Sequence, residues 1–121
     1  MSAHKNQNLL RRFGFALAGL RHALRSERSV RLEALFFVLV VAALAVLRPD
    51  PIWWAAVMLA SAAVVAAELL NTAIETLADH LCPEVHPKIR ALKDCAAAAV
   101  LVSVVGALAV AVALAVHLLR R

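Results

Sequence analysis

The sequence predicts an all-helical membrane protein, with one amphipathic helix at the membrane surface and three transmembrane helices after it. Of the 121 residues, 64% are hydrophobic, whereas ordinary soluble domains have about 45–50% apolar residues. Three stretches are long and apolar enough, or nearly so, to cross a bilayer, which takes about 20 residues. Apart from Arg48 at the end of the first stretch, the Lys and Arg residues behind the net charge of +5 lie outside these stretches, as is typical of membrane proteins.

The composition also excludes several other classes of protein. The chain has only two cysteines, which excludes a disulfide scaffold and leaves no zinc ligand set of ordinary spacing. A basic soluble chain could bind nucleic acid, but the apolar content is too high for that interpretation, so we expect no nucleic-acid partner. No glycine-rich phosphate loop occurs, so a bound nucleotide would have to be held by charged side chains and a metal ion.

Residues 5–31 are predicted to form the amphipathic surface helix. Arginines lie between or beyond apolar residues that recur at spacings of three or four, namely Leu9, Phe13, Leu17, Leu20 and Leu24. This pattern is typical of a helix that lies in a membrane interface. The alternative is a soluble helix packed on a protein core.

The predicted transmembrane helices are residues 32–48, 52–79 and 94–119. Two prolines separate the first from the second and two more separate the second from the third, because proline disfavours helix at the residue before it. Residues 1–31 carry seven Lys or Arg, and the loop before the third span carries three. The positive-inside rule therefore predicts a multi-pass protein with a cytoplasmic N-terminus.

Four polar residues late in the second span are the most informative feature of the sequence. Glu68, Asn71, Glu75 and Asp79 follow one another at spacings of 3, 4 and 4, so they share one face of a helix. Ionisable residues inside a membrane are costly and usually mark a functional path.

This stripe is suited to several kinds of chemistry. Carboxylates near an interface can bind Mg²⁺ together with substrate phosphates, and a deeper carboxylate such as Glu68 could act as a general base on a hydroxyl group. Asn71 could orient either group. The alternatives are a polar clamp between helices of an oligomer and a path for protons or ions.

A second acidic group is predicted at the start of the first span. Glu27 and Glu33 flank Arg31, and Arg31 follows Glu27 by four residues, so an ordinary helical ion pair would explain both residues. The functional interpretation is that Glu27 joins Glu75 around a metal ion. The loop before the third span is rich in polar residues and long enough to cover a ligand, although a solvated loop is the simpler interpretation.

Residues 67–101, AELLNTAIETLADHLCPEVHPKIRALKDCAAAAVL, closely resemble the small integral-membrane diacylglycerol kinases of bacteria. That family has an E-[ILV]-[IL]-N-[ST]-A-I-E core, an Asp four residues later, a loop with E-x-H, and K-D before the last span. All of these are present here. Residues 19–33, GLRHALRSERSVRLE, are similar to the family's G-L-[RK]-x-A…E…R-x-E segment.

The resemblance implies a homotrimeric helical bundle in the bacterial cytoplasmic (inner) membrane. It implies direct transfer of the γ-phosphate of ATP to diacylglycerol, with Mg²⁺, to give phosphatidic acid. Undecaprenol, which some family members phosphorylate, is the alternative substrate. A structural or channel-like membrane oligomer is the non-enzyme alternative.

The resemblance also implies roles for individual residues. Glu68 would be the general base, with Asn71 beside it in the catalytic site. Glu27 and Glu75 would hold the metal. The nucleotide would be bound by Glu27, Glu75, Asp79, Glu84, His86, Lys93 and Asp94. The lipid substrate would lie beside Arg31, Glu33 and Glu68.

Overall fold

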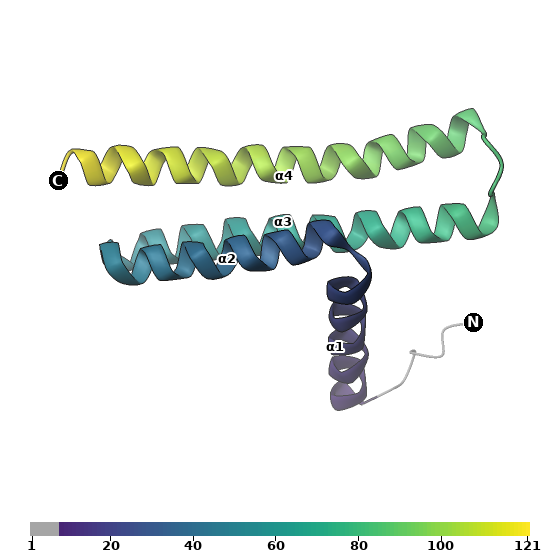
Figure 1. Ribbon diagram of the computed structural model, residues 1–121, viewed down its shortest axis with the longest axis horizontal. Helices are drawn as coiled ribbons and strands as arrows, with labels where there is room; N and C mark the ends of the chain where they lie inside the picture. The colour runs from purple at the N-terminus through teal and green to yellow at the C-terminus, as the bar shows by residue number, and fades with distance from the viewer. Residues whose placement is uncertain (1–7) are drawn as a thin grey trace.

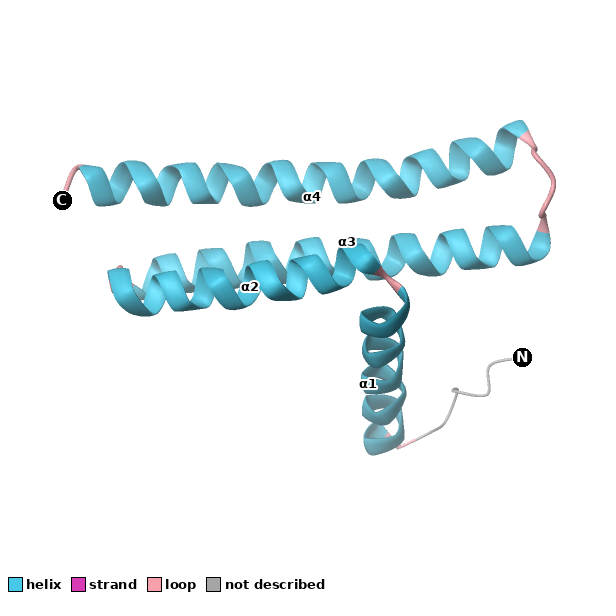
Figure 2. Ribbon diagram, viewed as in Figure 1, coloured by secondary structure: helices cyan, strands magenta, loops and turns pink. Residues whose placement is uncertain are grey.

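The computed structural model describes residues 8–121, which form four helices and, within that range, no strand (Figures 1 and 2). The helices are α1 (Leu9–Ser26), α2 (Arg28–Leu47), α3 (Pro51–Leu81) and α4 (Pro87–Leu119). Helices α2, α3 and α4 run side by side, and α1 lies crosswise to them (Figure 1). Each of these three long helices is long and apolar enough to cross a membrane. The predicted all-helical membrane fold is thus confirmed, and the chain is a multi-pass membrane protein.

The helices extend beyond the apolar stretches from which the spans were predicted. Helix α2 begins at Arg28 and α4 begins at Pro87, because charged residues such as Lys and Arg continue a helical backbone as readily as apolar ones. Residues 28–31, expected at the end of the surface helix, belong to α2 instead. The expected start of that helix, at residues 5–7, lies outside the described residues.

The ends of the helices are set by local backbone chemistry. Pro51 and Pro87 occupy the first turns of α3 and α4, where the missing proline N–H breaks no helical hydrogen bond. Helix α2 ends at Arg48, which adopts the left-handed conformation with φ 47° and ψ 54°. This conformation is most often taken by glycine, because a Cβ atom makes it costly.

Helix α3 packs against both α2 and α4. Two contacts tie the antiparallel pair of α3 and α4 near its two ends: the Trp53 and His117 rings, with centroids 5.3 Å apart, and an ion pair between Asp79 and Lys93. Helices α2, α3 and α4 together line an apolar groove of about 490 Å³.

Few side chains are buried within this single chain. The buried apolar residues are Ala23, Val30, Leu44, Val57, Ala78 and Ala96. Large side chains on the long helices, such as Leu59 (73% exposed) and Val102 (71% exposed), face outward. On α1, Leu9 is 80% exposed and Phe13 is 62% exposed, so no core formed by residues 8–121 covers its apolar face. Apolar surfaces of this extent require lipid or other protein chains.

Candidate functional site at the α3–α4 end

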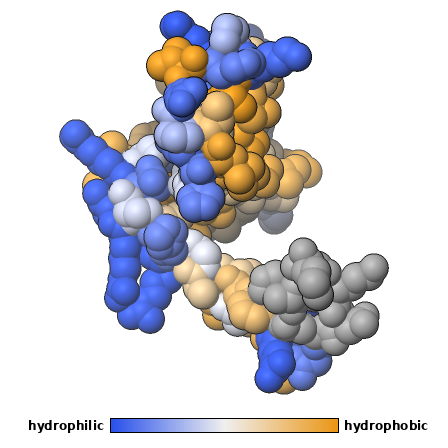
Figure 3. Space-filling view, turned by 90° about the vertical axis from the view of Figure 1, so that its right-hand side faces the viewer, coloured by the Kyte–Doolittle hydropathy of each residue, from blue (hydrophilic) through white to orange (hydrophobic). Residues whose placement is uncertain are grey.

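The polar stripe of α3, which consists of Glu68, Asn71, Glu75 and Asp79, begins at the level of the first turn of α2. The Ser29 hydroxyl, in the first turn of α2, donates a hydrogen bond to Glu68 Oε2 at 3.4 Å. Residues 69–81 of α3 continue beyond this contact, which adds roughly 20 Å of helix at a rise of 1.5 Å per residue. The α3–α4 hairpin therefore projects past the junction of α1 and α2 (Figure 1). Figure 3 looks at this end of the molecule, where hydrophilic residues gather beside an apolar surface.

Glu68 has two polar neighbours on α2. Besides Ser29, the Glu33 carboxyl group lies close to that of Glu68. Ser29 and Glu33 lie four residues apart, so they share one face of α2, and this face meets the stripe of α3. No motif or charge pattern in the sequence singles out Ser29. Its spacing from Glu33 is the signal that would have found it.

Two buried oxygen atoms near Glu68 have no hydrogen-bond partner among residues 8–121. They are Glu33 Oε2 and Asn71 Oδ1, and Asn71 lies one helical turn from Glu68 along α3. A buried acceptor left without a donor costs about 1–3 kcal/mol. Both atoms could therefore accept hydrogen bonds from a hydroxyl group or from another chain.

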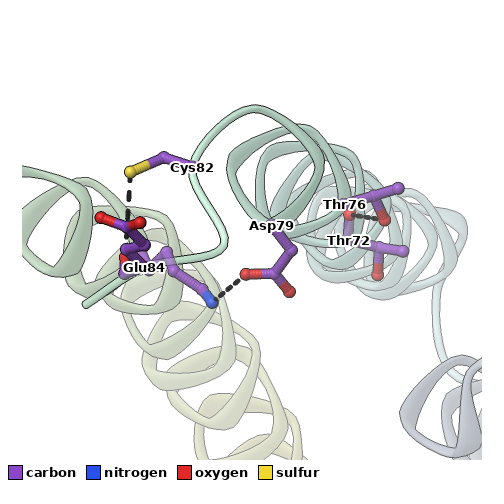
Figure 4. A network of polar contacts seen from close by, with 6 residues as sticks. Thr72, Thr76, Asp79, Cys82 and Glu84 are labelled. Carbon is purple, nitrogen blue, oxygen red and sulfur yellow. Dashed lines mark hydrogen bonds and ion pairs between the residues drawn. The ribbon is translucent and has the colours of Figure 1, made fainter. Parts of the chain in front are cut away.

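The outer end of the stripe is tied to α4. Lys93 Nζ lies 2.6 Å from Asp79 Oδ1 (Figure 4), and Glu75, one turn earlier on α3, adds its negative charge at the same ammonium group. The Thr76 hydroxyl donates a hydrogen bond to the Thr72 carbonyl oxygen at 2.7 Å (Figure 4). Its hydrogen bond therefore lies within α3.

The α3–α4 loop holds further residues that the resemblance assigns to the nucleotide. His86 Nδ1 accepts a hydrogen bond from the Lys88 backbone N–H at 3.2 Å and caps the start of α4. The Cys82 thiol donates to the Glu84 carbonyl oxygen at 3.8 Å (Figure 4). The side chains of Glu84 and Asp94 are exposed.

The helical ion pair between Glu27 and Arg31, one of the two interpretations of these residues, is absent from the described part of the chain, where Lys93 and Asp79 form the one ion pair. Helix α1 ends just before Glu27, whose φ of −104° and ψ of 119° are extended. Arg31 Nη1 instead donates to the carbonyl oxygens of Arg25 at 2.8 Å and Leu24 at 3.3 Å. The interpretation of Glu27 and Arg31 as an ordinary helical ion pair is therefore wrong.

No group of three or more His, Cys, Asp or Glu side chains within residues 8–121 is close enough together to hold a metal ion. Among those residues, no hydrogen bond joins Glu27 to Glu75, the two predicted metal ligands. Within residues 8–121, a single chain thus offers carboxylates but no cluster of three or more metal-ligating side chains. Mg²⁺ that is bound with a nucleotide commonly needs only one or two of them, because phosphates and water supply the other ligands.

The fold and this site together define a multi-pass helical membrane protein with an ionisable site at one end of its bundle. A family model described as prokaryotic diacylglycerol kinase matches residues 14–115. A diacylglycerol kinase from Synechocystis sp. is 36% identical over 104 residues, which are 85% of this chain and 59% of that relative. The chain belongs to the prokaryotic diacylglycerol kinase family, as its motifs predicted. It spans 59% of the length of this curated relative.

Proposed function

We propose that this protein transfers the γ-phosphate of ATP to diacylglycerol and forms phosphatidic acid at the cytoplasmic surface of the bacterial inner membrane. The observation that carries the proposal is the position of Glu68. It lies at the level of the α1–α2 junction, where Ser29 contacts it, while Glu75 and Asp79 lie farther out. With α1 in the interface, a lipid hydroxyl could reach Glu68 from the bilayer and ATP could reach the outer residues from water.

Glu68 acts as the general base in this proposal. Its carboxylate accepts the proton of the lipid hydroxyl while the hydroxyl oxygen forms a bond to the γ-phosphorus of ATP. The bond between that phosphorus and the β–γ bridging oxygen breaks, and ADP leaves. Phosphoryl transfer of this kind depends mainly on positioning and charge neutralisation. Asn71 orients the reacting groups, and Glu33 lies on the lipid side.

The nucleotide is held by side chains at the outer end of the stripe. Lys93 is the cation that lies closest to this group, and it is shared between Asp79 and the phosphates of the nucleotide. The remaining residues of this set are Glu27, Glu75, Glu84, His86 and Asp94. A cationic ammonium beside transferring phosphates stabilises the charge that develops in the transition state.

Mg²⁺ fits the carboxylates that remain without a partner in this chain. Glu27 and Glu75 make no side-chain hydrogen bond with any residue between 8 and 121, so both are available as oxygen ligands. When bound, the ion neutralises phosphate charge. In the proposed homotrimer, Glu27 and Glu75 of different protomers would come together and complete the site. The exposed apolar faces of the long helices support such an assembly.

The proposal is tested by transfer of labelled γ-phosphate from Mg-ATP to lipid in mixed micelles. Diacylglycerol and undecaprenol are offered separately, and Glu75→Gln serves as the inactive control. Labelled phosphatidic acid that disappears with Glu75→Gln is the expected result. Labelled undecaprenyl phosphate alone would keep the mechanism and overturn the substrate. No transfer to either lipid from a folded oligomer would overturn the kinase and favour a structural or channel-like role.

A further inference from the structure

The turn between α1 and α2 takes place at one residue, Glu27, without a residue that breaks helices. No Gly or Pro occurs between residues 20 and 48, and sharp bends in helical chains usually have such a local cause. We call this turn the elbow, residues Leu24–Arg31. It sets α1 crosswise to the three long helices (Figure 1), so some other contact must hold it.

Ala23 and Val30 are buried at this turn, and Arg31 supplies a polar contact across it. Its guanidinium Nη1 donates to the carbonyl oxygens of Arg25 and Leu24, at 2.8 Å and 3.3 Å. These oxygens belong to the last turn of α1, whose carbonyl groups have no partner within the helix. The positive charge also lies at the negative end of the α1 dipole. Arg31 therefore ties the end of α1 to the first turn of α2 from across the bend.

This arrangement has a consequence for Glu27. Arg31 is the cation that a continuous helix would place beside Glu27, yet its guanidinium group turns to the α1 carbonyls. The Glu27 carboxylate makes no hydrogen bond or ion pair within the described chain. Its backbone N–H is held by the Ala23 carbonyl at 2.8 Å. The backbone of Glu27 is thus held at the bend, and its carboxylate has no partner among residues 8–121.

We propose that Arg31 is a positioning residue, which holds the elbow so that the Glu27 carboxylate is presented, unpaired, to the magnesium nucleotide. This inference rests on the proposed function, because it assigns Arg31 an effect on the nucleotide side of the reaction. It differs from the lipid contact that the family resemblance implied for Arg31. The two roles separate in kinetics, since one acts on the KM for ATP and the other on the KM for the lipid.

The test uses the full-length protein in mixed micelles with three variants. Arg31→Gln removes the cation. Arg31→Lys keeps a positive charge, and its single ammonium group can still donate hydrogen bonds to carbonyl oxygens, without the planar fork of the guanidinium. Arg28→Gln is the matched control, because Arg28 is an exposed arginine in the same turn whose side chain bonds no described residue. Each variant is measured for kcat and for the KM of ATP and of diacylglycerol.

A structural measurement accompanies the kinetics. Spin labels replace Phe13 on α1 and Val46 on α2, both exposed, in protein whose Cys82 and Cys95 are changed to Ser. Labelled protein is diluted with unlabelled protein so that each assembly holds one labelled chain. The distance between the two labels reports the angle of the elbow independently of any activity.

With Arg31→Gln we expect a broadened label distance and a fall of about 10- to 100-fold in kcat/KM for ATP, since small misplacements of a binding group cost that much. The KM for diacylglycerol should stay within about twofold of its value in the unmodified protein, because Arg31 does not contact the lipid in this inference. Arg31→Lys recovers part of both effects, and Arg28→Gln resembles the unmodified protein.

Two results would overturn the inference. An unchanged label distance with Arg31→Gln would mean that Arg31 does not hold the elbow. A raised KM for diacylglycerol with an unchanged KM for ATP would return Arg31 to the lipid site. If the unmodified protein transfers no phosphate to lipid, the proposed function fails, and the label distance alone still decides whether Arg31 holds the elbow.

Discussion

Lys93 Nζ on α4 lies 2.6 Å from Asp79 Oδ1 on α3, across the loop that joins the two helices. The pair sits at the exposed outer end of the bundle, and exposed ion pairs contribute little to stability. Its position beside Glu75 therefore argues for a role in binding rather than in folding. In the proposed function, Lys93 exchanges this carboxylate partner for a phosphate.

Replacing Lys93 by Met should lower kcat/KM for ATP by about 10- to 100-fold, because a cation that stabilises phosphate charge is lost. The thermal midpoint of unfolding should change little, since the pair is exposed. Steady-state kinetics with varied ATP and thermal unfolding in detergent measure the two effects. A large fall in the midpoint with unchanged kinetics would instead make the pair a structural tie.

Replacing Glu68 by Gln should lower kcat by about 10²–10⁴-fold, the usual contribution of a general base. The amide keeps the shape of the side chain and can still accept the hydrogen bond from Ser29, so the assembly should remain folded. Phosphate transfer at saturating ATP and lipid measures kcat, and circular dichroism checks the fold. A variant that keeps its kcat would remove Glu68 from the role of base.

Replacing Ser29 by Ala should reduce kcat by about two- to tenfold, as expected for the loss of one ordinary hydrogen bond. The bond to Glu68 is long, at 3.4 Å, so the effect should be modest. Ser61→Ala is the matched control, because the Ser61 hydroxyl donates to the Val57 carbonyl of its own helix at 2.8 Å. Equal effects of the two changes would mean that the Ser29 hydroxyl does not orient Glu68.

Replacing His86 by Ala should loosen the first turn of α4, at a cost of about 1 kcal/mol, which is typical of a lost helix cap. His86→Asn should restore the cap, because Asn also accepts from a backbone N–H at this position. Hydrogen exchange of the α4 N-terminal amides measures the cap. If His86→Ala also raises the KM for ATP, and His86→Asn restores slow exchange without lowering that KM, His86 contacts the nucleotide as well.

Replacing Arg48 by Gly should raise the free energy of unfolding by up to about 1 kcal/mol, because glycine adopts the left-handed conformation without the cost of a Cβ atom. Arg48→Ala keeps that cost and serves as the control. Thermal unfolding in detergent compares the two variants. A glycine variant less stable than the alanine variant would mean that the left-handed conformation of residue 48 carries no net cost from a Cβ atom.

Much of the fold follows from local patterns in the chain. The apolar stretches of 32–48 and 52–79 predicted helices because every backbone polar group in a bilayer must be satisfied within its own segment. Pro51 and Pro87 predicted breaks, and the structure has them in the first turns of the helices that follow. The spacing of the stripe from Glu68 to Asp79 placed its members on one face, since helical periodicity is a local property.

The partners of that stripe could not be predicted in the same way. Periodicity gives the face on which Glu68 lies, but it does not say that α2 meets this face through Ser29 and Glu33. The elbow had no signal either, because no Gly or Pro marks residue 27. The expected pairing of Glu27 with Arg31 followed from a continuous helix, and the bend removed it.

By itself, the sequence determined the helical spans, the polar stripe and the family to which the chain belongs. These depend on residue type and on spacing within one helix. The tertiary structure alone decided that α2 meets Glu68, that Lys93 bridges to Asp79, and that Arg31 binds the carbonyl groups at the end of α1. Such contacts join residues of different helices, so they depend on how the helices pack and bend, which no local repeat in the sequence encodes.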